Sequence, residues 1–344
     1  MPRQFFIRAD ATKHTGTGHL MRCLALAQAL RKAEFDATFI SVCKSNSLHQ
    51  RLLDEGFKVI LLNRSHPDPA DWQTTEKILH SHPDCYVVLD GYIFDSFYQR
   101  SIKEAGYRLL VIDDMAHLDR YCCNILLNQN INAERLHYLA DEDTRLLMGP
   151  RYALLRNEFL NRSFLKRNIP NVARRLLVTL GGEDSDNQTL KVIQAIQQIK
   201  IDGFEAIVVV GSANPYLKLL QAECQKSQIS ICLINNALDM AELMASADMA
   251  VSAGGSTCWE LAFMGLPALI IILSDNQRMV AEGLQEAGTA INLGWYNWIS
   301  QSDIRKTLEK LAAGAEERAE MARRGRELVD GKGSKRLLKE IMSK

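Results

Sequence analysis

The sequence predicts an α/β protein made of two Rossmann-like, doubly wound domains, each with a parallel sheet covered by helices. Three observations support this prediction. The chain has 344 residues, more than one hydrophobic core usually organises. Short apolar, β-branched runs alternate with amphipathic segments along its whole length. The alternation also falls into two series, separated by a basic stretch without a strand pattern.

The first series predicts an N-terminal α/β domain over residues 1–150. Its apolar runs are continuous rather than alternating, which is typical of parallel strands buried on both faces. Strands are expected at residues 5–9, 37–42, 58–62, 85–90, 108–113 and 124–128, and helices at 19–33, 46–55, 70–81 and 96–105.

A linker is expected over residues 151–173, where basic residues replace the strand pattern and a proline lies near each end, Pro150 and Pro170. The second series then predicts a C-terminal α/β domain over 174–344. The last stretch, "GSKRLLKEIMSK", reads as a short helix that packs back on the first domain. Strands of the second domain are expected at residues 175–181, 205–211, 229–234, 249–254 and 268–273.

The composition argues against several classes of protein. Lys+Arg and Asp+Glu both total 41, so no basic stripe for nucleic acid is indicated. The longest apolar run, "LPALIIIL", is far too short for a membrane span, and the N-terminus has no signal-peptide pattern. The 8 cysteines include no CxxC pair, which favours reduced thiols and a cytoplasmic location. Nothing in the sequence indicates an oligomeric state.

Polar residues follow the predicted strands directly, and ligands of open parallel sheets bind at the carboxyl ends of the strands. With two domains, we expect the two polar edges to face one another across a cleft. The residues concerned are Asp10, Asp90-Gly91-Tyr92, Asp113-Asp114, Gly181-Gly182-Glu183-Asp184, Gly211-Ser212 and the run from Ser252 to Thr257.

The stretch "GTGH" lies where the first strand turns into the first helix. Gly16 and Gly18 permit a tight turn, and His19 falls in the first turn of the helix. The partial positive charge of a helix N-terminus disfavours imidazolium, so this position suits a neutral imidazole acting as general base. Arg22, one turn on, is placed to orient an anionic group. The alternative is a well-capped helix start without chemistry. The third glycine of GxGxxG is missing, so a dinucleotide turn is disfavoured.

The stretch "TLGGEDSDNQTL" is a second turn between strand and helix. Backbone N–H groups near Gly182, ahead of a helix N-terminus, form a natural anion cradle. Against this reading, Glu183, Asp184 and Asp186 repel phosphate unless they face away or bind hydroxyls. The alternative is a turn whose acidic residues cap the helix.

The segment "SAGGSTCWE" is the strongest site candidate. Gly254 and Gly255 allow close approach of backbone to a ligand, and Ser256 and Thr257 offer hydroxyls and N–H donors to a diphosphate. Glu260, at the end of the helix's first turn, is placed to accept hydrogen bonds from ribose hydroxyls. This combination is the general logic of nucleotide binding.

After the next strand, "SDNQ" places Asn276 and Gln277 at a second helix start, where an amide offers both donor and acceptor. Two weaker candidates for acid–base work or a metal are Asp90 with Tyr92 at one strand end and the pair Asp113-Asp114 at the next. Adjacent residues of a strand, such as Asp113 and Asp114, point to opposite faces. One of the two is expected to cap the following loop. Without clustered histidines or HExxH, no metal is expected, and without GxSxG, no serine hydrolase.

Taken in order, six segments resemble a known family. They are "RADATKHTGTGHLMRCLALAQAL", "LDGY", "VIDDMA", "MGPRYALLRNEF", "LVTLGGEDSDNQT" and "SAGGSTCWELAFMGLPALIIILSDNQ". The resemblance, over about residues 4–295, is to the UDP-sugar hydrolases of pseudaminic-acid biosynthesis, which act on UDP-2,4-diacetamido-2,4,6-trideoxy-β-L-altropyranose. It implies a GT-B-like fold, UDP held mainly by the C-terminal domain, and no cofactor.

The resemblance also implies roles for individual residues. The family's catalytic histidine falls on His19, its active-site tyrosine on Tyr92, its NQ asparagine on Asn276 and its WE glutamate on Glu260. Glu183 departs from the family pattern, which has a small residue there, and it adds negative charge beside the expected diphosphate site.

The implied reaction is attack of water on the anomeric carbon, with His19 as base, UDP as leaving group and inversion of the centre. Two alternatives remain open from the sequence. A UDP-sugar glycosyltransferase of the same fold would use the histidine on an acceptor hydroxyl. A non-catalytic protein would bind the nucleotide sugar alone.

Overall fold

The computed structural model describes residues 4–11, 17–43, 45–182, 184–212 and 214–343. The chain divides into two compact units. The N-terminal unit comprises Met1–Asn157 and Lys332–Lys344, and the C-terminal unit comprises Glu158–Gly331. The stretch 151–173, expected as a linker, is thus divided between the two units.

The N-terminal unit holds a 7-stranded parallel sheet in the order β3-β2-β1-β4-β5-β6-β7 among its described residues. Its strands are β1 (Gln4–Ala9), β2 (Asp36–Ser41), β3 (Lys58–Leu61), β4 (Tyr86–Asp90), β5 (Arg108–Ile112), β6 (Ile125–Asn128) and β7 (Arg145–Met148). Its helices are α1 (Gly18–Lys32), α2 (Asn46–Asp54), α3 (Pro69–His80), α4 (Ser96–Glu104), α13 (Gly333–Met342) and the short η1 (Ala133–Arg135) and η2 (Pro150–Tyr152).

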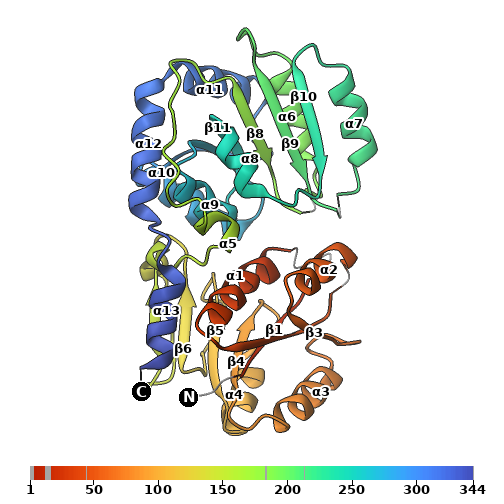
Figure 1. The fold of residues 1–344 in the computed structure, drawn as a ribbon, viewed down its shortest axis with the longest axis vertical. Coiled ribbons are helices and arrows are strands. Elements are labelled where there is room, and N and C mark those ends of the chain that lie inside the picture. The colour runs from red at the N-terminus through yellow and green to blue at the C-terminus, as the bar shows by residue number, and fades with distance from the viewer. Residues whose placement is uncertain (1–3, 12–16, 44, 183, 213, 344) are drawn as a thin grey trace. The chain divides into compact units, whose positions relative to one another are not determined.

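Strand β1 separates two hydrophobic layers, because successive side chains of a strand point to opposite faces. Phe5 and Ile7 pack under α1, α2 and α13, whereas Phe6 packs on the side of α3 and α4. Figure 1 shows these two groups of helices on opposite faces of the N-terminal sheet. The sheet is covered on both faces, as its continuous apolar strands predict.

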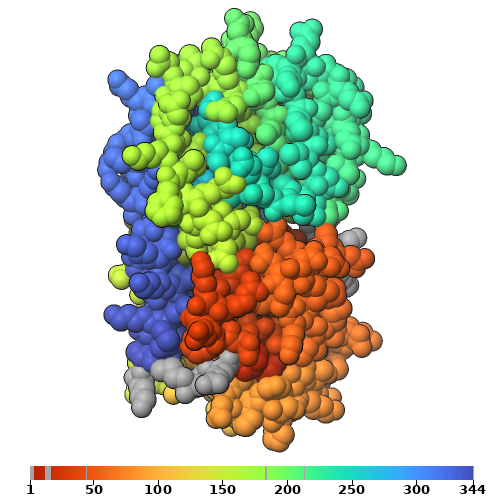
Figure 2. All heavy atoms as spheres, in the orientation of Figure 1, coloured from red at the N-terminus to blue at the C-terminus, as the bar shows by residue number. Residues whose placement is uncertain are grey.

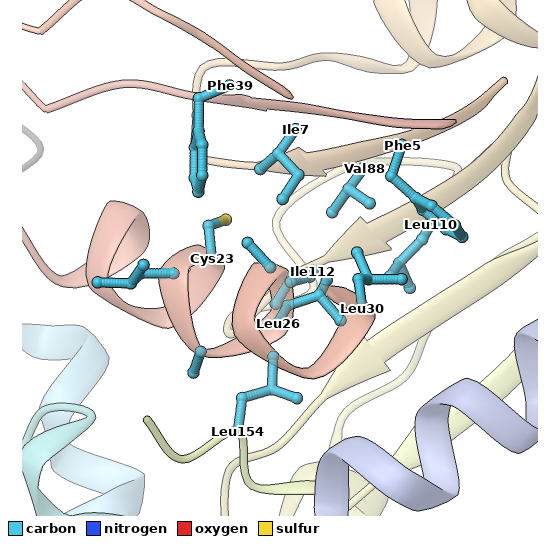
Figure 3. Close-up of a cluster of buried hydrophobic side chains, with 14 of the residues drawn as sticks. Phe5, Ile7, Cys23, Leu26, Leu30, Phe39, Val88, Leu110, Ile112 and Leu154 are labelled. Carbon is cyan, nitrogen blue, oxygen red and sulfur yellow. The ribbon is translucent and has the colours of Figure 1, made fainter. Parts of the chain in front are cut away.

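Helix α1 forms where the periodicity predicts it and presents one apolar stripe to the sheet. The stripe residues Leu20, Cys23, Leu24, Ala27 and Leu30 are completely buried. Figure 3 shows Cys23, Leu26 and Leu30 of this helix directed toward the strand side chains. Because these contacts fix the helix along its length, the residues of its first turn have a defined position.

The last helix, α13, belongs to the N-terminal unit and packs against α1. Its residues Leu337, Leu338 and Ile341 join the apolar layer under that helix. A Cβ at Gly333 would collide with the carbonyl oxygen of Ala153, so glycine permits the close approach of the chain at this point. Figure 2 shows the side chains of α13, in blue, against the N-terminal unit.

The C-terminal unit holds a 6-stranded parallel sheet in the order β10-β9-β8-β11-β12-β13 among its described residues. Its strands are β8 (Arg175–Thr179), β9 (Glu205–Val210), β10 (Ser230–Asn235), β11 (Met249–Ala253), β12 (Ala268–Ile272) and β13 (Ala290–Trp295). Its helices are α5 (Asn157–Leu160, at the boundary of the units), α6 (Gln188–Ile196), α7 (Leu217–Gln225), α8 (Met240–Ser246), α9 (Thr257–Met264), η3 (Asp275–Gln277), α10 (Arg278–Glu286), α11 (Gln301–Ala313) and α12 (Ala315–Leu328).

Two edge strands were not expected from the sequence. Strand β7 is short and follows the charged run Asp141–Asp143, and β13 is interrupted by Gly294 at φ +91°. Each pairs on one side only, with β6 and β12 respectively, so neither needs the long apolar run of a central strand. All the strands that the sequence predicts are present within a few residues of their expected bounds.

Each strand order reverses at one place, between β1 and β4 in the first sheet and between β8 and β11 in the second. At such a switch point the helices after the two neighbouring strands lie on opposite faces, which opens a crevice at the carboxyl ends. Helix α1 is the next element after β1, and "SAGGST" follows β11. Both predicted sites therefore lie at switch points.

Among the described residues, no helix combines the length and apolarity that crossing a membrane requires. Within the same residues, no three His, Cys, Asp or Glu side chains gather as metal ligands. The cysteines are free thiols, most of them buried, with Cys232 exposed.

Candidate functional site

The site in the N-terminal unit is built around His19, in the first turn of α1, and Asp90, the last residue of β4. Strands β1 and β4 are neighbours, so a helix that follows β1 reaches the end of β4 directly. His19 Nδ1 lies 2.6 Å from Asp90 Oδ1, and both side chains are buried. The carboxylate can only accept, so Nδ1 carries the proton of the neutral ring and Nε2 carries the lone pair.

Arg22 completes this arrangement one helical turn after His19. Its Nε and Nη2 donate to the two oxygens of Asp90 at 2.9 and 2.7 Å, and its Nη1 donates to Asp114 at 2.7 Å. Burial opposes the charge on Arg22, but Asp114 and Asp90 hold its pKa well above the usual value. The sequence predicts an anion-orienting arginine here, and the structure places its guanidinium on two carboxylates of its own unit.

Asp90 receives hydrogen bonds from three side chains of α1. Besides His19 and Arg22, the thiol of Cys23 donates to its Oδ2 at 3.4 Å. Burial favours the neutral acid, yet the adjacent Arg22 and His19 hold the pKa of Asp90 well below its usual range. Asp90 is therefore a fixed negative charge that orients the histidine ring. Arg22 Nη2 also lies 3.4 Å from His19 Nδ1.

Tyr92 lies beside His19, with the edge of one ring against the other at a centroid distance of 4.9 Å. Its hydroxyl donates to Asp114 Oδ2 at 3.0 Å. Asn130, after β6, donates to the other oxygen of the same carboxylate at 2.8 Å. Asp114 thus ties together side chains that follow β1, β4 and β6.

The adjacent aspartates after β5 have separate functions, as the strand geometry predicts. Asp113 accepts hydrogen bonds from the N–H groups of Met115 and Ala116, so it caps the following loop. Asp114 instead bonds Arg22 and Tyr92. The prediction that one of the pair caps the loop is confirmed.

The first part of the site in the C-terminal unit is the turn after β11. Gln277 Oε1 accepts the N–H of Gly254 at 3.2 Å and that of Leu273 at 3.0 Å, and thereby joins the turns after β11 and β12. A Cβ on Gly254 would lie 2.9 Å from the Cβ of Gln277, so only glycine fits. Gly254 and Gln277 therefore shape the turn, and the amide of Gly254 is occupied by protein.

Gly255 differs from its neighbour, since a Cβ there would meet nothing within 4 Å. Ser256 is the N-cap residue of α9, but its hydroxyl makes no capping hydrogen bond. Thr257 is the first residue of the helix and Glu260 lies half-buried at the end of its first turn. This helix start combines an open backbone position with the positive end of a helix dipole. Asn276 is exposed in η3 and accepts a hydrogen bond from Ser274.

The turn after β8 is tightly packed. A Cβ at Gly211 would collide with the carbonyl of Gly182, so the turns after β8 and β9 touch through their glycines. Asp184 is buried and accepts the N–H groups of Gln188 and Thr189, the first turn of α6. Its carboxylate faces its own helix, as the capping alternative predicts. Gly16 and Glu183 lie outside the described residues.

Sequence reasoning placed Asp90 at the polar sheet edge but did not predict its bond to His19, and it did not single out Asn130. Asp90 ends β4 and Asn130 lies shortly after β6, and this position at the end of a strand is the only signal that points to them. The bonds of Asp90 to His19 and Arg22, and of Asn130 to Asp114, depend on which strands are neighbours, which the sequence does not reveal.

Comparison with solved structures establishes the fold. Acinetobacter baumannii MurG superposes with a TM-score of 0.66 at 14% identity, over 98% of this chain and 99% of that one. Anabaena HepE, solved with UDP-glucose, superposes with a TM-score of 0.63 at 12% identity, over 98% and 99%. The chain has the GT-B fold of two Rossmann-like domains. Residues 175–340 match the glycosyltransferase family 28 C-terminal domain.

Three sequence relatives align with most of this chain, at 25 to 27% identity. SpsG, a spore coat polysaccharide biosynthesis protein of Bacillus subtilis, is 25% identical over 95% of this chain and 94% of its own. A Helicobacter pylori protein named pseudaminic acid cytidylyltransferase and UDP-2,4-diacetamido-2,4,6-trideoxy-β-L-altropyranose hydrolase is 27% identical over 89% of this chain. The uncharacterized protein MJ1062 of Methanocaldococcus jannaschii is 27% identical over 79%.

The chain spans about half the length of the last two relatives, 50% and 56% respectively. The comparisons thus define a GT-B-fold protein related to proteins of sugar metabolism.

Proposed function

We propose that this protein hydrolyses a UDP-linked 2,4-diacetamido-2,4,6-trideoxyhexose at its anomeric carbon and releases UDP and the free sugar. The observation that carries the proposal is the buried bond between His19 Nδ1 and Asp90, which leaves the lone pair of the neutral ring on Nε2. A histidine oriented by a carboxylate is a general base for a hydroxyl or a water.

In the proposed reaction His19 Nε2 takes a proton from water as the water oxygen bonds to the anomeric carbon. The bond from that carbon to the UDP oxygen breaks, and its electron pair leaves with UDP. Attack opposite the leaving group inverts the anomeric centre. Asp90 remains ionised and stabilises the imidazolium that forms, as its lowered pKa requires.

The diphosphate is assigned to the start of α9, with Gly255, Ser256 and Thr257 as donors and Glu260 accepting from ribose. Donors that meet the developing charge of UDP would make a separate protein acid unnecessary. Tyr92 and Asn276 are proposed to contact the sugar. The substrate class rests on the pseudaminic-acid enzyme among the relatives and on the motif resemblance.

The test is to incubate the purified protein with UDP-2,4-diacetamido-2,4,6-trideoxyhexose and to measure UDP release without any acceptor. We expect release in water alone. If UDP were released only in the presence of an added hydroxyl acceptor, the protein would be a glycosyltransferase and not a hydrolase. If the protein bound UDP but released none from the UDP-sugar under either condition, it would be a nucleotide-sugar-binding protein without this activity.

A glycosyltransferase is the second candidate, favoured by the match of residues 175–340 to a glycosyltransferase domain. It would use the same base and the same UDP site, with an acceptor hydroxyl in place of water. The two functions therefore differ only in the nucleophile, which is what the acceptor-free assay varies.

The two adjacent glycines of the UDP site give a matched pair of variants. Gly255→Ala adds a methyl group to open space, so we expect unchanged thermal stability and UDP affinity lower by about 10-fold, within the range for overpacking a contact. Gly254→Ala meets Gln277 and should lower stability as well. Calorimetric titration with UDP and thermal melting distinguish them. If Gly255→Ala bound UDP as tightly as the wild type, the diphosphate would have to bind at another place than the start of α9.

A further inference from the structure

His117, in the loop after β5, contacts the backbone of Tyr92 rather than its hydroxyl. Its Nε2 lies 3.1 Å from the carbonyl oxygen of Tyr92, and its Nδ1 lies 2.9 Å from Asp113 Oδ2. The rings of Tyr92 and His117 meet edge to face at a centroid distance of 5.7 Å. Tyr92 thus has a histidine on two sides, since His19 also meets it edge to face.

Both partners of the His117 ring are hydrogen-bond acceptors. A carbonyl oxygen and a carboxylate have no proton to give, so each bond needs an N–H on the ring. Neutral imidazole has one N–H and satisfies one partner, whereas imidazolium has two and satisfies both. The geometry around His117 therefore fits the charged form.

The surroundings of His117 favour that charge. The charged group that faces His117 is the carboxylate of Asp113. The hydrogen bond to this carboxylate raises the pKa of His117, and burial opposes the shift. Two tyrosines lie nearby, Tyr121 and Tyr138, and burial raises the pKa of each hydroxyl well above its usual value. Tyr92 approaches His117 from the turn after β4. Tyr138 donates to Asp113 Oδ1 and so helps to fix that carboxylate.

We propose that His117 is a positioning residue whose imidazolium form holds the Tyr92 turn in place against His19. This inference rests on the proposed function, in which Tyr92 contacts the sugar. When His117 loses its proton, one of its two bonds is lost, and the Tyr92 carbonyl is the weaker, uncharged acceptor. Tyr92 is then held by its hydroxyl bond to Asp114 and by its ring contacts.

The sign of the pH effect follows from the raised pKa. A group whose pKa is raised in the folded protein stabilises it fully below its ordinary value, about 6.5 for histidine. That contribution is lost as the pH rises through the native pKa. UDP release should therefore fall on the alkaline side of the profile as His117 deprotonates.

The first measurement needs no variant. In the full chain labelled with ¹⁵N-histidine and ¹³C-tyrosine, we expect both ring nitrogens of His117 to be protonated at pH 6.5. Its titration should lie above the ordinary histidine value, and Tyr92 resonances should shift with the same midpoint. A His117 that titrates at or below the ordinary value, or a Tyr92 that does not respond, would overturn the inference.

The second measurement compares pH profiles of UDP release in the wild type, His117→Asn and the control His66→Asn. In His117→Asn the alkaline fall should vanish, and kcat near pH 6.5 should be lower by roughly 10-fold, the worth of a hydrogen bond from a charged group, with KM little changed. His66, which pairs with Asp95, should keep the wild-type profile. An alkaline fall that persists in His117→Asn contradicts the proposal. If neither the wild type nor the variants release UDP, the proposed function fails. The resonance titration would still show whether the protonation of His117 holds Tyr92 in place.

Discussion

Replacing His19 with glutamine should lower the rate of UDP release by about 10²–10⁴-fold, the usual contribution of a general base. Glutamine retains a side-chain amide that can reach Asp90, so the buried carboxylate keeps a hydrogen-bond donor. It has no basic lone pair at neutral pH, and the attacking water would keep its proton. The measurement is kcat for UDP release together with UDP affinity by calorimetric titration.

UDP affinity should remain near the wild-type value in this variant, because the diphosphate is assigned to α9 and not to α1. His66→Gln is the matched control, since His66 is another largely buried histidine of the same unit beside an aspartate. It should lose little activity. If His19→Gln released UDP at a rate close to that of the wild type, the base would have to be another group.

The fold was predictable because its signals are local. Continuous apolar runs joined by amphipathic helices indicate parallel sheets covered on both faces, and both sheets are of this kind. What escaped prediction are the edge strands β7 and β13. An edge strand pairs on one side only, so sequences such as "RLLM" and "AINLGW" can form one without the β-branched run of a central strand.

The site was predictable in its residues but not in its connections. His19 was predicted from its place at a helix start, and Tyr92 from its place after a strand together with the resemblance. The bond between His19 and Asp90 joins residues 71 positions apart, and it exists because β1 and β4 are neighbours in the sheet. Periodicity along the chain carries no information on strand order. For the same reason Arg22 looked free for a ligand, whereas it is bonded to Asp90 and Asp114.

The glycines of the C-terminal unit show the same limit at a finer scale. "AGGST" predicted two positions for close approach of a ligand. The structure separates them, because the space beside Gly254 is filled by Gln277 and the space beside Gly255 is open. A glycine required by protein packing and a glycine available to a ligand are identical in sequence. Only the neighbour 23 residues later distinguishes them.

Replacing Asp90 with asparagine should lower the rate of UDP release by about 10⁴-fold, at the upper end of the range for His19→Gln, because a histidine base held in the wrong tautomer loses about this much. The asparagine amide can donate to Nδ1, which then holds the lone pair and leaves the proton on Nε2, where water must be deprotonated. The change also removes one of the two carboxylates from buried Arg22, so the free energy of unfolding should fall by about 3 kcal/mol. Because the pKa of Asp90 is lowered, its stabilising effect exists above pH 4 or so and fades as the pH falls toward the native value.

The chain supplies a control that separates the two effects of this change. Arg8 is also completely buried and also paired with two carboxylates, Asp10 and Asp71, but in contacts that do not involve His19. Asp71→Asn should therefore lower the free energy of unfolding by a similar amount and leave the rate per folded molecule unchanged. Thermal melting and kcat, measured on both variants, give the comparison. Equal losses of rate per folded molecule in the two variants would mean that breaking either buried arginine pair lowers activity, and that Asp90 does not act by setting the tautomer of His19.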